Sequence, residues 1–158
     1  MALRFIYLIP WEKLIIRLED SNLEWHFYFF EFVNDLSSSS ELINELGTIG
    51  VYSKLIDYCN CFPLDRRIEI CKMFMAILDR IPPLECLIFI QNRVLSIFFN
   101  MLDIESEIIG DILNCLNMIN QKIDSINELD IIRHEYEEYQ AISIFEDLEE
   151  EYREMGFC

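Results

Sequence analysis

The residues of this sequence best suited to act as nucleophiles or metal ligands are its six cysteines, Cys59, Cys61, Cys71, Cys86, Cys115 and Cys158. Only Cys59 and Cys61 lie close together. A zinc site requires four ligands, usually with a second spaced pair or histidines, and none follows at a suitable spacing. Most of the cysteines lie within apolar helical patterns, where a free thiol behaves as a small hydrophobic side chain. We therefore expect reduced structural thiols, no metal and no cofactor, which favours a cytoplasmic or nuclear location.

The histidines and glycines do not complete a catalytic arrangement either. His26 and His134 lie about a hundred residues apart, and neither is spaced to pair with a cysteine or serine. We expect His26, within an aromatic segment, to be a core or boundary residue, and His134, among acids, to be solvated. The segment 47–50 lacks the lysine of a phosphate loop, and the acidic run 149–151 lacks the pattern of a calcium loop. We predict that the protein is not an enzyme.

Two pairs of side chains have a spacing suited to holding a peptide. Phe30 and Asn34 are four residues apart, as are Met75 and Asp79, so each pair lies on one helical face. Asparagine can both donate to and accept from the unpaired backbone groups of an extended peptide. A bulky side chain one turn earlier can pack against the stem of a lysine or arginine, while acids bind its cationic head. Alternatively, Phe30 and Met75 are core residues and Asn34 is a helix C-terminal residue.

The elements that must position these side chains are predicted to be helices. The chain has 4 glycines and 4 prolines, and 53% of its residues are hydrophobic, which favours an ordered, helical chain. Hydrophobic residues recur at helical spacing in a series of segments. We predict helices over 10–18, 23–36, 41–46, 51–58, a stretch that starts after Pro63, 84–91, 94–102, 108–119, and a final helix or helix pair over about 127–152.

Polar residues and glycines predict where these helices begin and end. Ser39 or Ser40 is expected to cap the helix at 41–46, which should end at Gly47. Asp65 is a candidate cap for the helix after Pro63. The segment 120–126 is expected to be a polar connection.

The order of a short helix, an amphipathic helix and a buried helix recurs along the chain. The buried helices centre on Phe30, Phe74 and Leu113, which are 44 and 39 residues apart. The amphipathic helices end near positions 38 to 46 residues apart, at Leu18, Ile56, Leu102 and Leu148. A period of about 40 residues is typical of armadillo or HEAT repeats. We predict a single all-α domain over residues 1–158, a right-handed α-solenoid of about three to four armadillo-like repeats. The alternative is an irregular helical bundle.

The charge of the chain narrows the classes of partner. The formal net charge is −17, and residues 124–158 hold 12 acids against Arg133 and Arg153, so −10 lies in this acidic C-terminal region, with its helix at about 127–154. Such a field repels DNA, RNA and anionic lipid, and attracts basic proteins or peptides. The alternative is a solvated tail that maintains solubility. No run of about 18 uncharged apolar residues suggests a membrane span, and the N-terminus lacks a signal-peptide pattern.

Three stretches resemble the C-terminal half of the importin-alpha family of armadillo proteins. That family carries a tryptophan followed, four residues later, by an asparagine on the third helix of a repeat. Phe30 and Met75 stand at the tryptophan position, and Asn34 and Asp79 stand at the asparagine position. The segment 134–146 is similar to the closing helix of the family. The resemblance covers most of the chain but does not include the basic N-terminal segment of the family.

The resemblance implies a concave groove that binds a basic peptide or a transport partner, with Phe30, Asn34, Met75 and Asp79 as binding residues. Together with the charge, it predicts a non-enzymatic protein-binding module of the cytoplasm or nucleus, which uses this groove or the acidic C-terminal end. One alternative is a scaffold subunit whose exposed repeat ends are covered by another protein. Another is a compact bundle that binds an amphipathic partner helix.

Overall fold

The protein is all-α, as the sequence predicts. The computed structural model describes residues 3–19, 23–102, 104 and 107–154, and every regular element within these ranges is a helix. The helices, in chain order, are α1 (Leu3–Ile6), α2 (Trp11–Ile16), the 3-10 helix η1 (Arg17–Glu19), α3 (Leu23–Leu36), α4 (Ser40–Thr48), α5 (Val51–Cys59), α6 (Leu64–Arg80), α7 (Pro83–Gln91), α8 (Val94–Leu102), α9 (Ile109–Asp124), α10 (Leu129–Glu138) and α11 (Ala141–Glu154).

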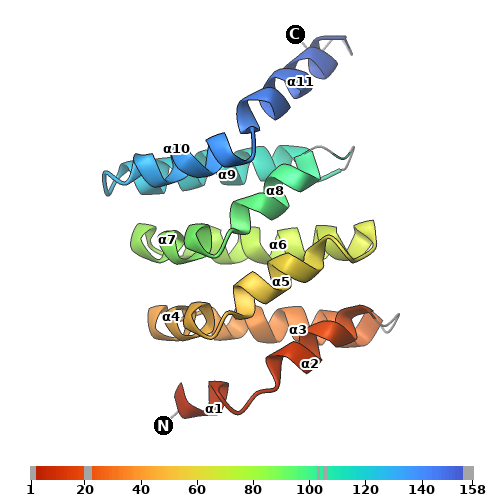
Figure 1. The fold of residues 1–158 in the computed structure, drawn as a ribbon, viewed down its shortest axis with the longest axis vertical. Helices are drawn as coiled ribbons and strands as arrows, with labels where there is room; N and C mark the ends of the chain where they lie inside the picture. The colour runs from red at the N-terminus through yellow and green to blue at the C-terminus, as the bar shows by residue number, and fades with distance from the viewer. Residues whose placement is uncertain (1–2, 20–22, 103, 105–106, 155–158) are drawn as a thin grey trace.

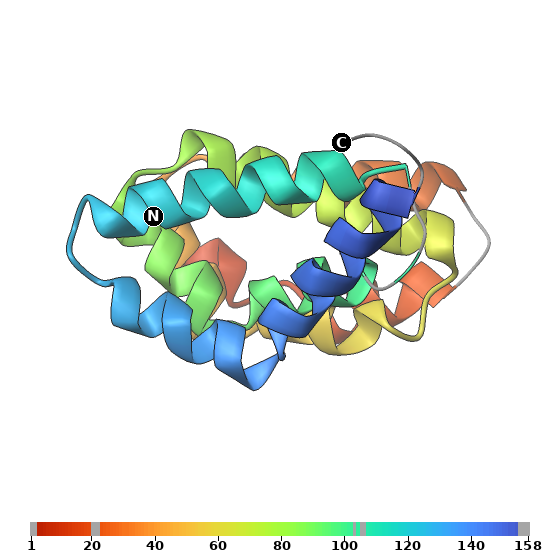
Figure 2. The same ribbon diagram turned by 90° about the horizontal axis from the view of Figure 1, so that it is seen from above.

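The helices are stacked in layers along one long axis, with the two termini at opposite ends (Figure 1). The helices α3, α6 and α9 lie one above the other, and α4 packs against α7 beside them. The helices α2, α5, α8 and α11 cross these layers obliquely and contact one another in that order. Seen from above, α9 lies along one side of the stack and α10 along the other, and α11 crosses the end of the stack between them (Figure 2).

A residue in the left-handed conformation turns the chain at three corresponding breaks. Gly50, with φ of 77°, separates α4 from α5; Arg93, with φ of 66°, separates α7 from α8; and Gln140, with φ of 51°, separates α10 from α11. The residues that follow each break begin one of the oblique helices. The same local geometry therefore recurs in three layers, although only one of the three positions holds glycine, the residue that adopts it without strain.

The start of α4 follows the sequence prediction, but its end does not. Ser39 is the cap, since its side chain accepts a hydrogen bond of 3.3 Å from the backbone N–H of Leu42. The predicted end at Gly47 is wrong, because α4 continues through Thr48. A Cβ at Gly47 would lie 2.8 Å from the Cγ2 of Ile88 on α7. Glycine therefore serves close packing between α4 and α7 here, and the change of direction occurs at Gly50.

Three other predicted boundaries are also corrected. The first predicted helix, 10–18, is α2 followed by the 3-10 helix η1, and part of the turn predicted after it lies outside the described residues. Asp65 lies in the first turn of α6 and does not cap it, because Pro63 holds the cap position. The predicted connection at 120–126 is mostly helical, since α9 continues to Asp124. Its polar residues stay helical because other layers provide their partners, as described below.

The core runs through all the layers as one cluster of buried side chains. At its centre Tyr52, Phe74 and Phe89 join α5, α6 and α7, and the rings of Tyr52 and Phe89 have centroids 4.4 Å apart. The hydroxyl of Tyr52 lies 2.9 Å from the hydroxyl of Ser37, at the end of α3. Burial raises the pKa of Tyr52, so the hydroxyl stays protonated and able to donate. The aromatic centre thus joins α5, α6 and α7, and the Tyr52 hydroxyl links them to the end of α3.

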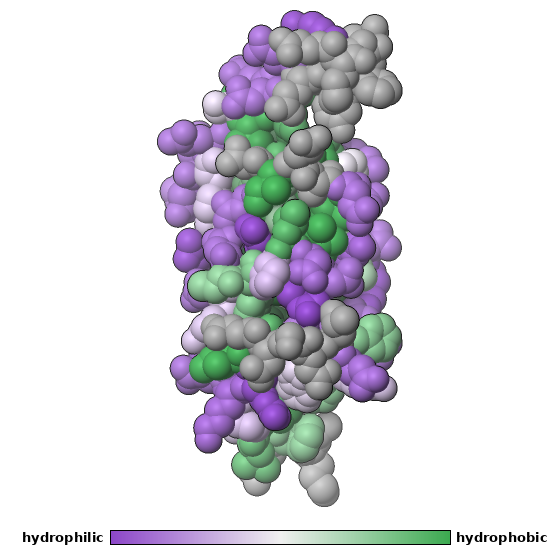
Figure 3. Space-filling view, turned by 90° about the vertical axis from the view of Figure 1, so that its right-hand side faces the viewer, coloured by the Kyte–Doolittle hydropathy of each residue, from purple (hydrophilic) through white to green (hydrophobic). Residues whose placement is uncertain are grey.

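The two ends of the stack have different surfaces. In Figure 3, green apolar surface gathers along the middle of the upper layers and again at the lower, N-terminal end. The exposed side chains at the N-terminal end include Phe5, Tyr7 and Leu8, the last of which is 80% exposed. Purple surface lies at the upper end of the stack in Figure 3, where α11 carries exposed acidic residues.

Candidate protein-binding face

A hollow of about 360 Å³ lies between α3 and α6, and we call it the first hollow. Its apolar wall consists of Phe27 and Phe30 from α3 with Met73 and Ala76 from α6. Four charged side chains also line it, and their formal charges cancel: Glu31, Glu69, Arg66 and Lys72. His26 lies buried in its lining, as expected for a core or boundary residue, whereas His134 is exposed on α10.

The first predicted pair lies in this hollow, and each of its members also has a structural role. Phe30 is 8% exposed and packs against Phe29, with ring centroids 6.0 Å apart. Asn34 lies in the last turn of α3, where its Oδ1 accepts a hydrogen bond of 2.8 Å from Nη1 of Arg80. Phe30 is therefore largely a core residue and Asn34 a helix C-terminal residue, which is the alternative to a peptide-binding role. Phe30 presents its remaining surface to the first hollow, and Asn34 lies at the hollow's edge.

A second hollow of about 330 Å³ lies between α6 and α9. The second predicted pair lines it, with Met75 half-buried and Asp79 exposed. The facing helix α9 contributes Asp111, Asn114, Cys115 and Met118 to the lining. Two carboxylates, from Asp79 and Asp111, therefore line this hollow from opposite helices.

The two hollows form a row, because Lys72 of α6 lines both of them. Its Nζ lies 3.3 Å from Oε1 of Glu69, which lines the first hollow. The structure thus places the two predicted pairs in successive hollows of one face. Lys72 was not predicted as a binding residue, although it lies one helical turn before Met75. Asp111 was not predicted either, because no pattern local to α6 could reveal a residue of α9.

Two cations tie the carbonyl ends of the stacked helices to the next layer. The Nζ of Lys122, in the last turn of α9, donates to the carbonyl oxygens of Leu78, Asp79 and Ile81 at 2.6, 2.8 and 2.8 Å. Arg80 at the end of α6 donates in the same way to the carbonyl oxygen of Asn34, and to that of Ser37 at 3.3 Å. A cation is favoured there by the partial negative charge of a helix C-terminus.

The same contacts position the candidate binding residues. Arg80 holds the backbone and the side chain of Asn34, and Lys122 holds the backbone of Asp79. Lys122 and Asn120 lie in the segment that the sequence predicted as a connection. Asn120 accepts a hydrogen bond of 2.9 Å from the hydroxyl of Tyr136 on α10. Because these partners lie in neighbouring layers, a local reading of the sequence could not place them.

The buried cysteines are suited to packing. Burial raises the pKa of Cys59 and Cys115 to about 12 and that of Cys86 to about 11, and it also raises the pKa of Cys71. Thiols with these values stay protonated near neutral pH and are poor nucleophiles. Among the described residues Cys61 is the exposed cysteine. In the described part of the chain, no group of three histidine, cysteine, aspartate or glutamate side chains could hold a metal ion.

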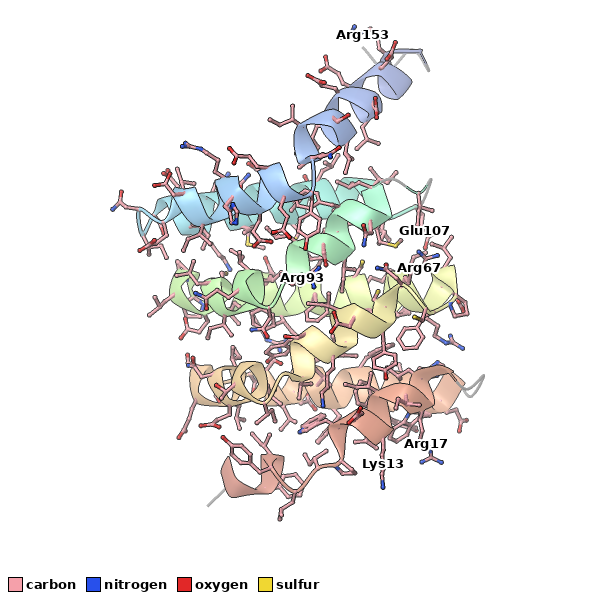
Figure 4. The ribbon with its side chains drawn as sticks, viewed as in Figure 1. Lys13, Arg17, Arg67, Arg93, Glu107 and Arg153 are labelled. Carbon is pink, nitrogen blue, oxygen red and sulfur yellow. The ribbon has the colours of Figure 1, made fainter. Side chains whose placement is uncertain are left out.

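The charged side chains differ between the two ends of the stack. Figure 4 shows Lys13 and Arg17 near the N-terminal end, Arg93 among the middle layers and Arg153 on α11 at the other end. Arg93, directly before α8, links α5 to the end of α10, since its Nη1 lies 3.9 Å from Asp57 of α5 and its Nε donates to the hydroxyl of Tyr139, directly after α10, at 3.3 Å. On α11 the pair of Arg153 with Glu149, at 2.8 Å, neutralises only a small part of the acidic end.

No protein-family model, curated protein or solved structure matches this chain. Within the described ranges no single helix has the length and apolar character to cross a membrane; α7 and α8 have them only when taken together, across a bend of 74°.

Proposed function

We propose that the chain is a right-handed α-solenoid of armadillo-like repeats, related to the C-terminal half of importin-alpha, that acts as a non-enzymatic protein-binding module. Two recurrences support this proposal. The left-handed residues Gly50, Arg93 and Gln140 lie 43 and 47 residues apart at corresponding breaks. Arg80 and Lys122 make corresponding cation contacts to the preceding layer. Both fit a repeat period of about 40 residues.

We propose that the face formed by α3, α6 and α9 binds a basic peptide. The observation that carries this is the row of two hollows, in which the pair Phe30 and Asn34 and the pair Met75 and Asp79 occupy successive positions. A peptide that runs along the stack meets both hollows in turn. The apolar walls can pack against side-chain stems, and the carboxylates of Asp79 and Asp111 can bind a cationic head.

The acidic C-terminal end supports the same class of partner. The exposed carboxylates of α11 include Glu146, Asp147, Glu149 and Glu150. Burial and the neighbouring Glu138 raise the pKa of Glu135 on α10, as is expected where carboxylates are crowded. A negative field of this kind accelerates the approach of a basic partner, and salt screens it. The buried reduced thiols fit a partner in the cytoplasm or nucleus.

A titration of the protein with a fluorescent lysine- and arginine-rich peptide, at two salt concentrations, tests this function. The double variant Asp79→Asn with Asp111→Asn removes two negative charges from the second hollow. We expect it to weaken binding about tenfold at low salt. The matched control, Asp147→Asn with Glu150→Gln, removes two charges from α11 and should change the dissociation constant by about twofold or less. Absence of binding at low salt, or equal effects of the two double variants, would count against this face.

A second candidate function is that of a subunit in a larger assembly. The observation in its favour is the exposure of Phe5, Tyr7 and Leu8 together at the N-terminal end, at 56%, 58% and 80%. Apolar surface at the end of a stack of repeats is usually covered by a capping element or by a partner. Light scattering after size exclusion tests this function: oligomers that Leu8→Asp converts to monomers favour it, and a stable monomer with basic-peptide affinity favours the first candidate.

A further inference from the structure

We propose that the two hollows bind different side chains of one peptide. The first binds an apolar side chain, the second binds a lysine or arginine, and these two peptide residues lie three positions apart. This inference rests on the proposed function, because it concerns the same face. It goes further by assigning a chemistry to each hollow and a spacing to the peptide.

The first hollow favours an apolar side chain. Phe27, which is 59% exposed, and the exposed Ala76 offer apolar surface that a ligand can cover. The two carboxylates of the lining are offset by Arg66 and by Lys72, so no net negative charge remains to hold a cation. Covering this apolar surface favours binding of an apolar side chain, whereas a cation placed there would meet two like charges.

The second hollow favours a cation. Its lining holds two carboxylates, Asp79 and Asp111, and one cation, Lys72, whose Nζ already lies within 3.3 Å of Glu69. The thioethers of Met75 and Met118 supply flexible apolar surface for the stem of a long side chain. The thiol of Cys115 adds no charge, because burial raises its pKa to about 12. The net negative charge of this hollow complements an ammonium or guanidinium group.

The stacking of the helices sets the spacing in the peptide. Packed helices lie about 8–10 Å apart, and the hollows occur between successive members of the series α3, α6 and α9. A peptide in the polyproline II conformation places residues three positions apart on the same side, with a separation of about 9 Å. A peptide with this conformation therefore presents one side chain to each hollow if three positions separate them.

Arg66 distinguishes the two hollows, because it lines the first alone, whereas Lys72 lines both. A peptide shifted by one layer would place its cation in the first hollow, close to Arg66 as well as to Lys72. The charges that line the first hollow therefore disfavour this shifted register.

Fluorescence anisotropy with a set of peptides of identical composition tests the inference. Each peptide carries one leucine and one arginine in a serine-rich background, separated by one to five positions in either order. We expect a three-position peptide to bind about tenfold more tightly than the other separations, because only it fills both hollows. Equal affinity across the separations would overturn the inference, and it would leave the proposed basic-peptide function intact.

Variants on the exposed surface assign each peptide side chain to its hollow. Asp79→Asn with Asp111→Asn should weaken the peptide with arginine, and should have no effect once glutamine replaces the arginine. Ala76→Gln, which adds a polar amide to the wall of the first hollow, should weaken binding of the peptide with leucine. It should have no effect once serine replaces the leucine. Lys72→Glu should raise the affinity of peptides with two arginines three positions apart. If each variant acts regardless of the peptide, the assignment is wrong, and if no peptide binds at low salt, the proposed function fails with it.

Discussion

The two seams of the stack, one between α3 and α6 and the other between α6 and α9, share a backbone arrangement and differ in side-chain chemistry. Each is closed by a cation that reaches the carbonyl end of the preceding helix, Arg80 in the first seam and Lys122 in the second. Beside that closure, the first seam has a hollow with balanced charges and an aromatic wall, and the second has a hollow with net negative charge. Because the closure and the core hold the layers, the side chains that line the two hollows can differ without a change in the stack.

The largest effect is expected from breaking the closure of the second seam. Lys122→Met removes three hydrogen bonds to carbonyl oxygens and leaves those acceptors without their cation. We expect the free energy of unfolding to fall by about 3 kcal/mol, measured by urea denaturation. The control Lys72→Met removes a lysine whose ion pair is exposed, and it should cost about 0.5 kcal/mol or less. Equal losses from the two variants would contradict the role of the carbonyl contacts.

Breaking the closure of the first seam should cost less. Arg80 is exposed, so water can partly replace its hydrogen bonds to Asn34 and to the carbonyl oxygen of Ser37 when the side chain is removed. We expect Arg80→Met to lower the free energy of unfolding by about 1–2 kcal/mol. Arg80→Lys should recover only part of this loss, since a single ammonium cannot reproduce the planar fork of a guanidinium. Full recovery by lysine would show that charge alone closes this seam.

A smaller effect is expected from the hydroxyl contact between α3 and α5. Tyr52→Phe removes the hydrogen bond to Ser37, whose hydroxyl still donates to the Val33 carbonyl oxygen at 2.7 Å. We expect a loss of about 1 kcal/mol in the free energy of unfolding. Tyr28→Phe, on an exposed ring, is the matched control and should change stability by about 0.3 kcal/mol or less. A similar loss in both variants would mean that the Tyr52 hydroxyl contributes little.

The smallest effect per residue is expected from pH, which changes the charge of buried thiols in the second seam. The thiols of Cys71 and Cys115 lie on the two helices of the second seam, and burial raises the pKa of both above an ordinary value near 9.0. A group with a raised folded-state pKa stabilises the fold fully below its unfolded pKa, and this contribution is lost as pH rises toward the folded value. At pH 9 each buried thiol should cost about 0.4 kcal/mol.

Urea denaturation between pH 7.5 and 10 measures this loss. Cys115→Ala should reduce the loss in the free energy of unfolding with rising pH by the contribution of one buried thiol. Cys61→Ser, at an exposed cysteine, should leave the decline unchanged. An unchanged decline in Cys115→Ala would contradict the burial of that thiol.

The sequence predicted the helices where the apolar period and the breaks are local. The helices at 23–36 and 94–102 have the predicted bounds, and the Ser39 cap was one of two candidates. The prediction failed at Gly47 and at 120–126, where local breaker and polarity rules point to a loop. In the structure, Gly47 and residues 120–124 are helical; Ile88 packs against Gly47, and distant backbone carbonyls bind Lys122.

By itself, the sequence determined the helical class of the chain, the spacing of its buried helices and the positions of the two candidate pairs, since each depends on residues within a few turns of one another. Only the tertiary structure decided that each pair lines a hollow, that Asp111 and Asp79 line the same hollow, and that Arg80 binds Asn34 across 46 positions. The reason is physical: a hollow exists only between two packed helices, and packing brings together side chains that no local periodicity relates.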